Sequence, residues 1–356
     1  MKRRLSIGSA VLLLAAVVAV VVWDGPGDAR GGGVPTTVRG VIGSEKLAFF
    51  RDPRVVERFA AHGLSVEVDT AGSRQIATSV DLGGYAFAFP SSSPAAQKIQ
   101  RDRGTTAGYT PFQSPLAVAS FEPVVRLLEA AGAVRRGAGD YRVLDVAAVL
   151  ELAGTRWDQL PGNTAYPVRK NILVTTTNPA ESNSAAMYLA AAAFVANGDA
   201  AVTAPEQEAR VLPLVAGLFR DQGYTQNSTE GPFEDYLAAG MGKAPLALVY
   251  ESQYLDRVLR GDGSIRPDMR LLYLAPTVYS KHTLVPLDDR GDEVGRVLST
   301  DAELGRLAAA FGFRTTDPAH FAGVVGDKAP VDLVDVVEPP SFEVLERLLD
   351  AVGAPS

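Results

Sequence analysis

The stretch Thr37–Ser93 (TVRGVIGSEKLAFFRDPRVVERFAAHGLSVEVDTAGSRQIATSVDLGGYAFAFPSSS) decides the fold. Residues 37–43, 64–70 and 85–89 are short apolar or alternating runs, which is the pattern of β-strands. Asp52-Pro53 between the first two runs is a helix start with an N-cap and an N1 proline, and Gly72-Ser73-Arg74 opens a second helical segment. Strands that alternate with helices predict a parallel sheet.

Further strands follow along the chain. Residues 115–120 (PLAVAS) predict a strand that crosses to a second lobe, and 278–286 a strand that returns. Residues 171–177 and 244–250 predict strands of the second lobe. The predicted fold class is therefore α/β, with two lobes that are each a mostly parallel sheet flanked by helices and that are joined by two crossing strands. We place lobe 1 at 37–116 and 278–356, and lobe 2 at 117–277.

An uncharged apolar run precedes this body. Leu5–Trp23 follows Lys2, Arg3 and Arg4, and such a run with a basic flank predicts a single transmembrane helix with the body outside the cytoplasm. The alternative is a cleaved secretory signal, although this run is longer than usual and no small-x-small cleavage site follows it. Residues 24–36 are predicted to be a linker. Both readings place the body in the extracytoplasmic space; the first anchors it in the cell membrane.

Composition excludes several classes of function. The chain has no cysteine, so disulfides, thiolate metal sites and a lipidated cysteine anchor are excluded. The net charge of −7 argues against binding to nucleic acid. His62, His282 and His320 share no metal-ligand spacing, and the acidic turn 288–293 lacks the oxygen spacing of a calcium loop. We therefore predict no metal, no cofactor and no catalytic residue.

Polar side chains gather where the predicted strands end. The loops contain Ser44 after the first strand, Ser73 and Arg74 after the second, Ser91 and Ser92 after the third, and Asn183 and Ser184 at a helix start in the second lobe. Ligands of open α/β sheets bind beyond the carboxyl ends of the strands, where helix N-termini offer free N–H groups. Serine and asparagine are also preferred N-caps, so each loop alone has a purely structural explanation.

Tyr250 and Glu251 differ because they place a carboxylate at a strand end. Glu251 can accept hydrogen bonds from a hydroxyl, an amine or a protonated oxyanion, or it can simply open the helix that follows. If Glu251 faces the cleft, it counts against a fully ionised anion unless Arg74 balances its charge.

These motifs as a set resemble the type II periplasmic-binding-protein class of extracellular solute-binding proteins. The resemblance covers about 38–352 and is carried by GSEK at 43–46, GSRQ at 72–75, PSSS at 90–93, KNILVTTT at 170–177 and LVYESQ at 248–253. It extends to actinobacterial members encoded beside von Willebrand factor A-type proteins. It implies two lobes that close on a ligand. Its implied ligand contacts are Ser44, Ser73, Ser91 and Ser92 in the first lobe, and Asn183, Ser184, Tyr250 and Glu251 in the second.

The resulting functional hypothesis is a membrane-tethered solute-binding protein that captures a small polar or anionic ligand. Its partners would be that solute, the membrane, and an ABC-type permease or a von Willebrand factor A-type protein. Transport members of the class in Gram-positive bacteria usually carry a lipobox cysteine, which this chain lacks, so sensing or presenting is an alternative role. A non-catalytic module that docks a protein partner is a second hypothesis, and a hydrolase is a third.

Overall fold

The computed structural model describes residues 35–353, apart from 138, 140, 180–181, 220–221, 223–228 and 334. The anchor predicted at Leu5–Trp23 and nearly all of the linker lie outside these residues and stay predictions. The unit that begins at Pro35 is described by itself. Within the described part of the chain, no helix has the length and apolar character needed to cross a bilayer.

The first sheet confirms the parallel arrangement predicted from Thr37–Ser93. Strand β1 (Thr36–Ile42) pairs in parallel with β2 (Leu64–Thr70) on one side and β3 (Phe87–Phe89) on the other. β3 begins later than the predicted 85–89, because the Tyr85 N–H bonds back to the Leu82 carbonyl in a 3-10 turn. We call the region around these strands lobe 1.

The helices of lobe 1 begin at the predicted signals. Asp52 accepts a hydrogen bond from the backbone N–H of Arg54 and so caps α2 (Pro53–Ala61). Gly63, at a φ of 74°, turns the chain into β2, a conformation that favours glycine. The other helices of this lobe's first half are the short η1 (Ser44–Lys46), α1 (Leu47–Arg51), α3 (Ser73–Thr78), η2 (Leu82–Gly84) and α4 (Ser93–Arg103).

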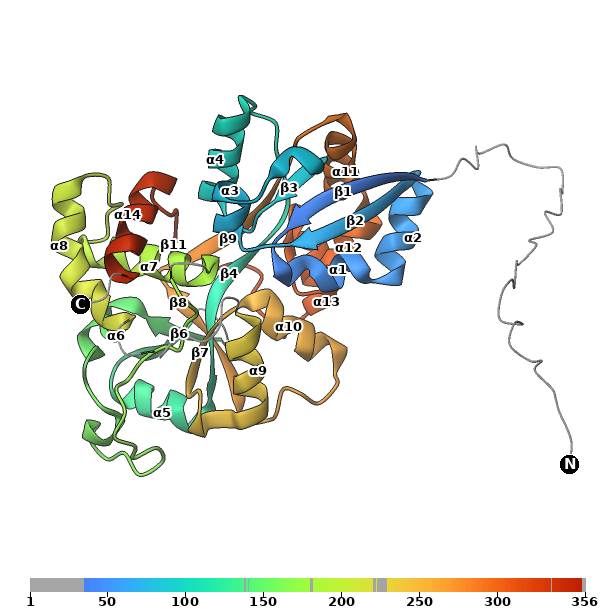
Figure 1. Ribbon diagram of the computed structural model, residues 1–356. Helices are drawn as coiled ribbons and strands as arrows, with labels where there is room; N and C mark the ends of the chain where they lie inside the picture. The colour runs from blue at the N-terminus through green and yellow to red at the C-terminus, as the bar shows by residue number, and fades with distance from the viewer. Residues whose placement is uncertain are drawn as a thin grey trace, which may run out of the picture. The chain divides into compact units, whose positions relative to one another are not determined.

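Two long strands, β4 (Tyr109–Phe121) and β9 (Thr277–Pro286), connect lobe 1 to the rest of the unit (Figure 1). They pair antiparallel with each other, and β9 also pairs antiparallel with β3. The strand order is β2-β1-β3-β9-β4, followed by β8 (Met269–Ala275), β6 (Arg142–Asp145) and β5 (Val134–Arg136). The predicted crossing strands are therefore present, and β4 is longer than the predicted 115–120.

The second sheet is mixed, which corrects the prediction of a mostly parallel lobe 2. Strands β7 (Leu246–Tyr250) and β8 (Met269–Ala275) both pair antiparallel with β4, while β6 (Arg142–Asp145) pairs in parallel with β8. β5 (Val134–Arg136) adds an antiparallel edge. The antiparallel pairs arise because β4 enters from lobe 1 and both neighbours run back toward it. We call this region lobe 2.

The strand predicted at 171–177 is not a regular strand. Only Thr175 joins β7, through its N–H to Leu246 and its carbonyl to the N–H of Leu248. The neighbouring N–H of Thr176 is taken by the Gln222 side chain instead. At Thr176 a hydrogen bond to a side chain thus takes the place of a backbone hydrogen bond between strands.

Lobe 2 is built around the buried helix α7 (Asn183–Ala196). Its alanines let neighbouring elements approach closely, so nearly all of its side chains are buried. The other helices of lobe 2 are α5 (Glu122–Ala130), α6 (Val146–Leu152), η3 (Trp157–Gln159), α8 (Pro205–Val215), η4 (Ala216–Leu218), α9 (Glu230–Ala239), η5 (Gly240–Gly242) and α10 (Glu251–Arg260).

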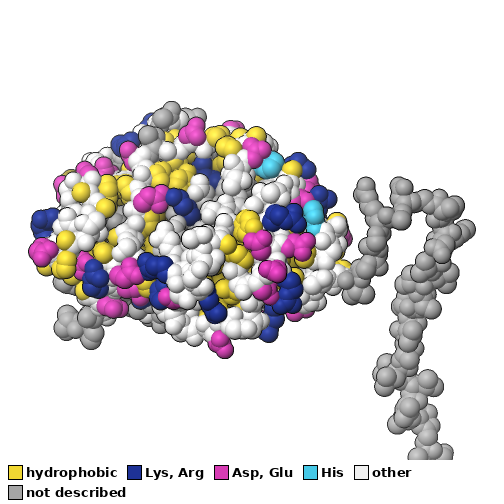
Figure 2. Space-filling model, turned by 90° about the horizontal axis from the view of Figure 1, so that it is seen from above, with side chains coloured by type: hydrophobic (Ala, Val, Ile, Leu, Met, Phe, Trp, Pro, Cys, Tyr) yellow, Lys and Arg dark blue, Asp and Glu magenta, His cyan; other side chains and the backbone are white. Residues whose placement is uncertain are grey.

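The C-terminal segment returns to lobe 1 and ends across both lobes. It contains α11 (Asp289–Thr300), α12 (Ala302–Ala310), β10 (Arg314–Thr315), α13 (Pro318–Val325), β11 (Val336–Val337) and α14 (Phe342–Gly353). Helix α14 contacts α4 of lobe 1 and α7 and α8 of lobe 2 (Figure 1). Acidic and basic side chains are interspersed on the face seen in Figure 2.

Candidate functional site

A small cavity lies where loops of the two lobes meet. Its volume is about 40 Å³, and its lining includes the predicted contacts Ser44, Ser73, Asn183, Ser184 and Tyr250. Gly43, Glu45, Ala71, Gly72, Ser182 and Thr229 complete the lining. The loops that follow the strands thus bring residues that are far apart in the sequence to one cavity. A single water molecule needs roughly 10–15 Å³ of such space, so the cavity has room for a small chemical group only.

A larger cavity of about 350 Å³ adjoins this space and shares Ser44 and Glu45 with it. Helix α1 of lobe 1 and helices α9 and α10 of lobe 2 contribute to its walls, together with Phe311 and Phe313. The two cavities together form what we call the inter-lobe cleft.

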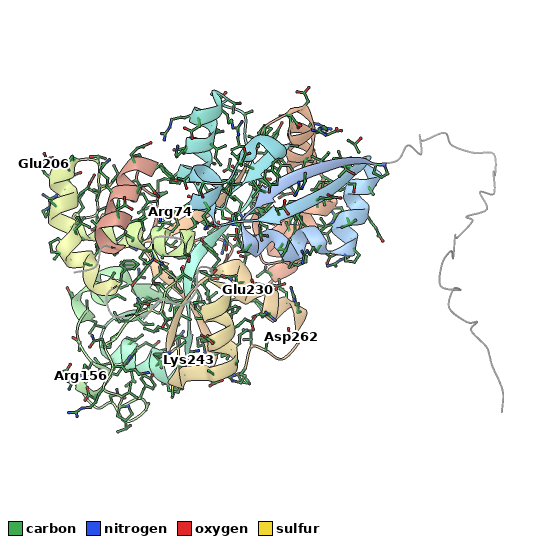
Figure 3. The ribbon with its side chains drawn as sticks, viewed as in Figure 1. Arg74, Arg156, Glu206, Glu230, Lys243 and Asp262 are labelled. Carbon is green, nitrogen blue, oxygen red and sulfur yellow. The ribbon has the colours of Figure 1, made fainter. Side chains whose placement is uncertain are left out.

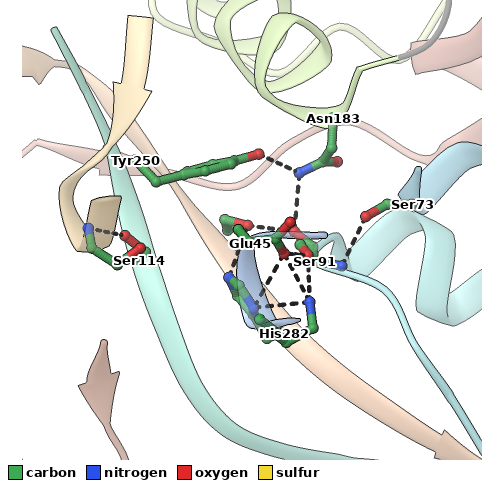
Figure 4. A network of polar contacts seen from close by, with 10 residues as sticks. Glu45, Ser73, Ser91, Ser114, Asn183, Tyr250 and His282 are labelled. Carbon is green, nitrogen blue, oxygen red and sulfur yellow. Dashed lines mark hydrogen bonds and ion pairs between the residues drawn. The ribbon is translucent and has the colours of Figure 1, made fainter. Parts of the chain in front are cut away.

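A buried lysine supports the lobe 1 side of the cleft. The Lys46 side chain has no exposed surface, and its Nζ lies 2.8 Å from Oε1 of Glu45 and 2.6 Å from Oγ of Ser91. Ser91 in turn donates to Oε1 of Glu45 (Figure 4). Nζ also lies 4.8 Å from the centre of the Phe89 ring. Charge-assisted hydrogen bonds of this kind make the burial of the amine possible.

His282 on β9 completes this network. Its Nδ1 lies 3.2 Å from Nζ of Lys46 and its Nε2 3.4 Å from Oγ of Ser280. Burial and the neighbouring Lys46 hold the pKa of His282 well below its usual range, so its ring is neutral. Burial lowers the pKa of Lys46 as well, and the charge of Glu45 opposes that shift.

Asn183 links the two lobes across the small cavity. Its Nδ2 donates to the Ser91 carbonyl at 3.0 Å and to the Tyr250 hydroxyl at 2.9 Å (Figure 4). Burial raises the pKa of Tyr250 well above its usual value, so the hydroxyl stays protonated and able to donate. Both amide hydrogens of Asn183 are used, which leaves its Oδ1 as the remaining acceptor.

Other predicted serines take structural partners. Ser73 Oγ accepts the backbone N–H of Ser91 at 2.9 Å, and Ser92 Oγ caps α4 through the N–H of Ala95 at 3.5 Å. Ser91 is buried behind the cavity lining. Ser184 shares hydrogen bonds with the hydroxyls of Thr177 and Ser182. The cap explanation therefore holds for Ser92, whereas Ser73 and Ser184 combine their local bonds with a place in the lining.

Arg74 binds the C-terminal helix. Its Nε and Nη2 donate to the carboxylate of Glu346 on α14 at 2.7 and 2.5 Å, and its Nη1 reaches the Pro179 carbonyl of lobe 2 at 3.3 Å (Figure 3). Arg74 thus connects α3 to both the last helix and the second lobe.

Glu251 is the first residue of α10 and is fully buried. It forms a bidentate ion pair with Arg314, at 2.6 and 2.8 Å, and accepts a 2.6 Å hydrogen bond from Tyr273. Burial disfavours the charge of Arg314, but the hydrogen bonds and charge of Glu251 raise its pKa above the usual value. Burial and then Glu251 raise the pKa of Tyr273.

The sequence analysis missed Glu45, Lys46 and His282. A signal for the first two was present in the GSEK run itself, since Glu45 and Lys46 follow the strand-end Gly43 by two and three residues, close to the end of β1. His282 gave no signal, because only the pairing of β9 with β4 brings it opposite Phe112 and near Lys46. In the described part of the chain, no cluster of histidine and acidic side chains is arranged to hold a metal ion.

Comparisons with known proteins agree on the fold. No family model and no curated protein matches the sequence. The sulfate-binding protein SubI of Mycobacterium tuberculosis is 16% identical, with a TM-score of 0.54 over 87% of this chain and 96% of that one. Iron-bound HitA of Pseudomonas aeruginosa is 12% identical, with a TM-score of 0.55 over 90% and 100% of the two chains.

A third similar structure is the periplasmic binding protein AfuA of Actinobacillus pleuropneumoniae with fructose-6-phosphate bound. It is 10% identical, with a TM-score of 0.55 over 89% and 96% of the two chains. At such low identity, likeness concerns fold alone. The chain shares the two-lobed α/β fold of these three binding proteins.

Proposed function

We propose that this protein is an extracytoplasmic solute-binding protein, tethered to the cell membrane by Leu5–Trp23, that captures a small polar solute between its lobes. One observation carries the proposal: strand-end loops of both lobes line a single cavity, with Ser44 and Ser73 on one side and Asn183 and Tyr250 on the other. A solute held by both sides stabilises the closed arrangement by its differential affinity for it.

Of the two solute classes predicted from the sequence, polar and anionic, the cleft favours the polar one. Among the described residues, Glu45 is the charged one in the lining of the small cavity, and Arg74 pairs with Glu346 on α14. The hydroxyl groups around the small cavity can donate and accept hydrogen bonds, and Oδ1 of Asn183 can accept one. An ABC-type permease or a von Willebrand factor A-type protein of the actinobacterial kind remains the proposed partner.

A thermal-shift screen of the purified protein against amines, amino acids, sugars and oxyanions tests the proposal. A ligand at 100 times its dissociation constant stabilises the fold by about 2.7 kcal/mol. We expect a hit that Asn183→Ala weakens, and that Asn197→Ala at the other end of α7 leaves unchanged. A hit that neither variant alters would contradict this location of the site.

The second candidate is a module that docks a protein partner. It is favoured by side chains of the protein itself that already bridge the lobes, namely Asn183 to Ser91 and Arg74 to Pro179. A flat solute screen together with a stoichiometric partner would support it. A hydrolase would need a serine beside a base, and Ser91 lies beside the amine of Lys46. Ser91 is buried, however, and its hydroxyl donates a hydrogen bond to Glu45, which supports a structural role for it.

A further inference from the structure

Glu45 is the charged group common to both parts of the inter-lobe cleft. It lines the small cavity among hydroxyl groups, and it also lines the larger one. In the part of the chain that the structure describes, no lysine or arginine lines the small cavity. Any solute that enters this part of the cleft therefore meets a carboxylate.

One oxygen of the Glu45 carboxylate accepts hydrogen bonds from the described residues, and the other accepts none. Oε1 accepts from both Lys46 and Ser91, whereas no hydrogen bond reaches Oε2 from the described residues. A Cβ atom added at Gly43 would lie 2.6 Å from Oε1 and 2.9 Å from Oε2. A side chain at this position would displace the carboxylate of Glu45 and the hydroxyl of Ser91, whereas glycine leaves room for both, and Lys46 holds the carboxylate from behind.

The walls of the larger cavity carry balanced charges. Arg257 pairs with Glu234 and Arg260 with Asp256. Arg51 of lobe 1 and Glu230 of lobe 2 also line this cavity, on opposite sides and with opposite charge. These groups leave no surplus of positive charge to hold a fully ionised anion beside Glu45.

Aromatic rings line the same cavity. Phe233, Phe311 and Phe313 belong to its walls, and the guanidinium of Arg260 lies 6.0 Å from the centre of the Phe311 ring. The face of Phe311 is thus already used by a cation. Aromatic faces and a carboxylate together favour positively charged organic groups.

We propose that the cleft selects a small organic solute that carries a primary ammonium group, and that Glu45 is the residue that determines this specificity. The ammonium donates to Oε2 of Glu45, and the organic part of the solute occupies the larger cavity beside Phe311. Lys46 acts as a positioning residue, because it holds Oε1 and leaves Oε2 to the solute. This inference rests on the solute-binding function proposed above.

The test compares solutes that differ only in the proposed feature. The melting temperature of the purified protein is measured with ethanolamine, putrescine, glycine and lysine as primary ammonium probes, with choline as a cation without an N–H donor, and with sulfate. The variants are Glu45→Gln, which removes the charge at nearly constant shape, and the exposed Glu57→Gln on α2 as a matched control.

We expect at least one primary ammonium probe to stabilise the wild type and the control, with choline weaker. Loss of a hydrogen bond to a charged group predicts affinity for that probe reduced about tenfold or more in Glu45→Gln. If Glu45→Gln unfolds because Lys46 loses its partner, the double variant Glu45→Gln/Lys46→Met removes both charges and must show the same loss.

Other outcomes overturn the inference in distinguishable ways. Sulfate that stabilises the wild type and the Glu45→Gln variant alike refutes the ammonium specificity and leaves solute binding intact. Choline that binds as well as ethanolamine assigns recognition to the aromatic rings and refutes the role of Glu45. If no probe and no other solute of the screen shifts the melting temperature, the ammonium inference and the proposed function both fail.

Discussion

The amine of Lys46 donates a 2.6 Å hydrogen bond to the hydroxyl of Ser91, and neither side chain is reached by solvent. The lysine ends the short helix η1 after β1 and the serine lies in the loop after β3, so this bond joins the ends of two neighbouring strands at the floor of the cleft. Removing one member of a buried polar pair costs more than the pair contributes, because the other member is left without a partner.

Replacing Lys46 with methionine is therefore expected to destabilise the fold by about 3–5 kcal/mol, since Glu45 loses the cation beside it. Urea denaturation measures this loss. The double variant Lys46→Met/Glu45→Gln should recover part of it, because both charges then disappear together. Equal stability of the single and double variants would show that the two side chains are not coupled.

His282 makes the free energy of unfolding depend on pH in the acid range. Its pKa in the folded protein lies well below the ordinary value of 6.5, so below pH 6.5 the unfolded chain takes up a proton that the folded protein does not. Stability contributed by the neutral ring is present above pH 6.5 and is lost as pH falls toward the lowered native pKa, by up to about 1.4 kcal/mol per pH unit.

The measurement is the free energy of unfolding at pH 7 and at pH 5. The ring of His282 packs against Phe89, Phe112 and Phe313, and Lys46 and Glu45 are the charged groups nearest to it. His282→Phe should make the pH dependence shallower, while His320→Gln should not. An unchanged slope in His282→Phe would assign the acid sensitivity to other groups.

The ion pair of Glu251 and Arg314 is expected to be structural. Its side chains are 0% and 7% exposed, so either Glu251→Gln or Arg314→Met alone should cost about 3–5 kcal/mol. A double-mutant cycle by denaturation should give a large coupling energy. If Glu251→Gln instead leaves stability intact and abolishes solute binding, the sequence-based expectation of a ligand contact is the correct one.

Two acidic residues of α14, Glu346 and Glu343, should contribute differently to the contacts of this helix. Glu346 pairs with Arg74 with side chains 21% and 15% exposed, whereas Glu343 pairs with Arg101 on the open surface, where solvent screens the attraction. We expect Glu346→Gln to increase hydrogen exchange in α14 and α3. Glu343→Gln serves as the matched control, and equal exchange in both variants would argue against a link through Arg74.

Local patterns predicted the elements of lobe 1 because their signals are local. Asp52 caps its helix, Gly63 turns the chain, and the alternating residues of β1 and β2 pair in parallel. The mixed sheet of lobe 2 could not be predicted, because strand direction there depends on β4, which enters from the other lobe.

The location of the candidate site could be predicted from the sequence, whereas its side-chain contacts could be predicted only in part. Strand ends converge in a parallel sheet, so Ser44 and Ser73 could be assigned to the cleft from sequence alone. Whether a polar side chain faces the cleft or a neighbour depends on distant partners. Glu251 meets Arg314 across 63 positions and Arg74 meets Glu346 across 272, and no local signal reports such pairs.

The position of β9 between β3 and β4 also determines when the sheet of lobe 1 can be completed during synthesis. During synthesis from the N-terminus, β3 and β4 emerge long before residues 277–286, so the position between them stays unfilled while strands β5 to β8 of lobe 2 are produced. Unpaired strand edges invite aggregation. We therefore expect this chain to need chaperone protection in the interval before β9 is released, and truncations that remove β9 and the segments after it should yield insoluble protein.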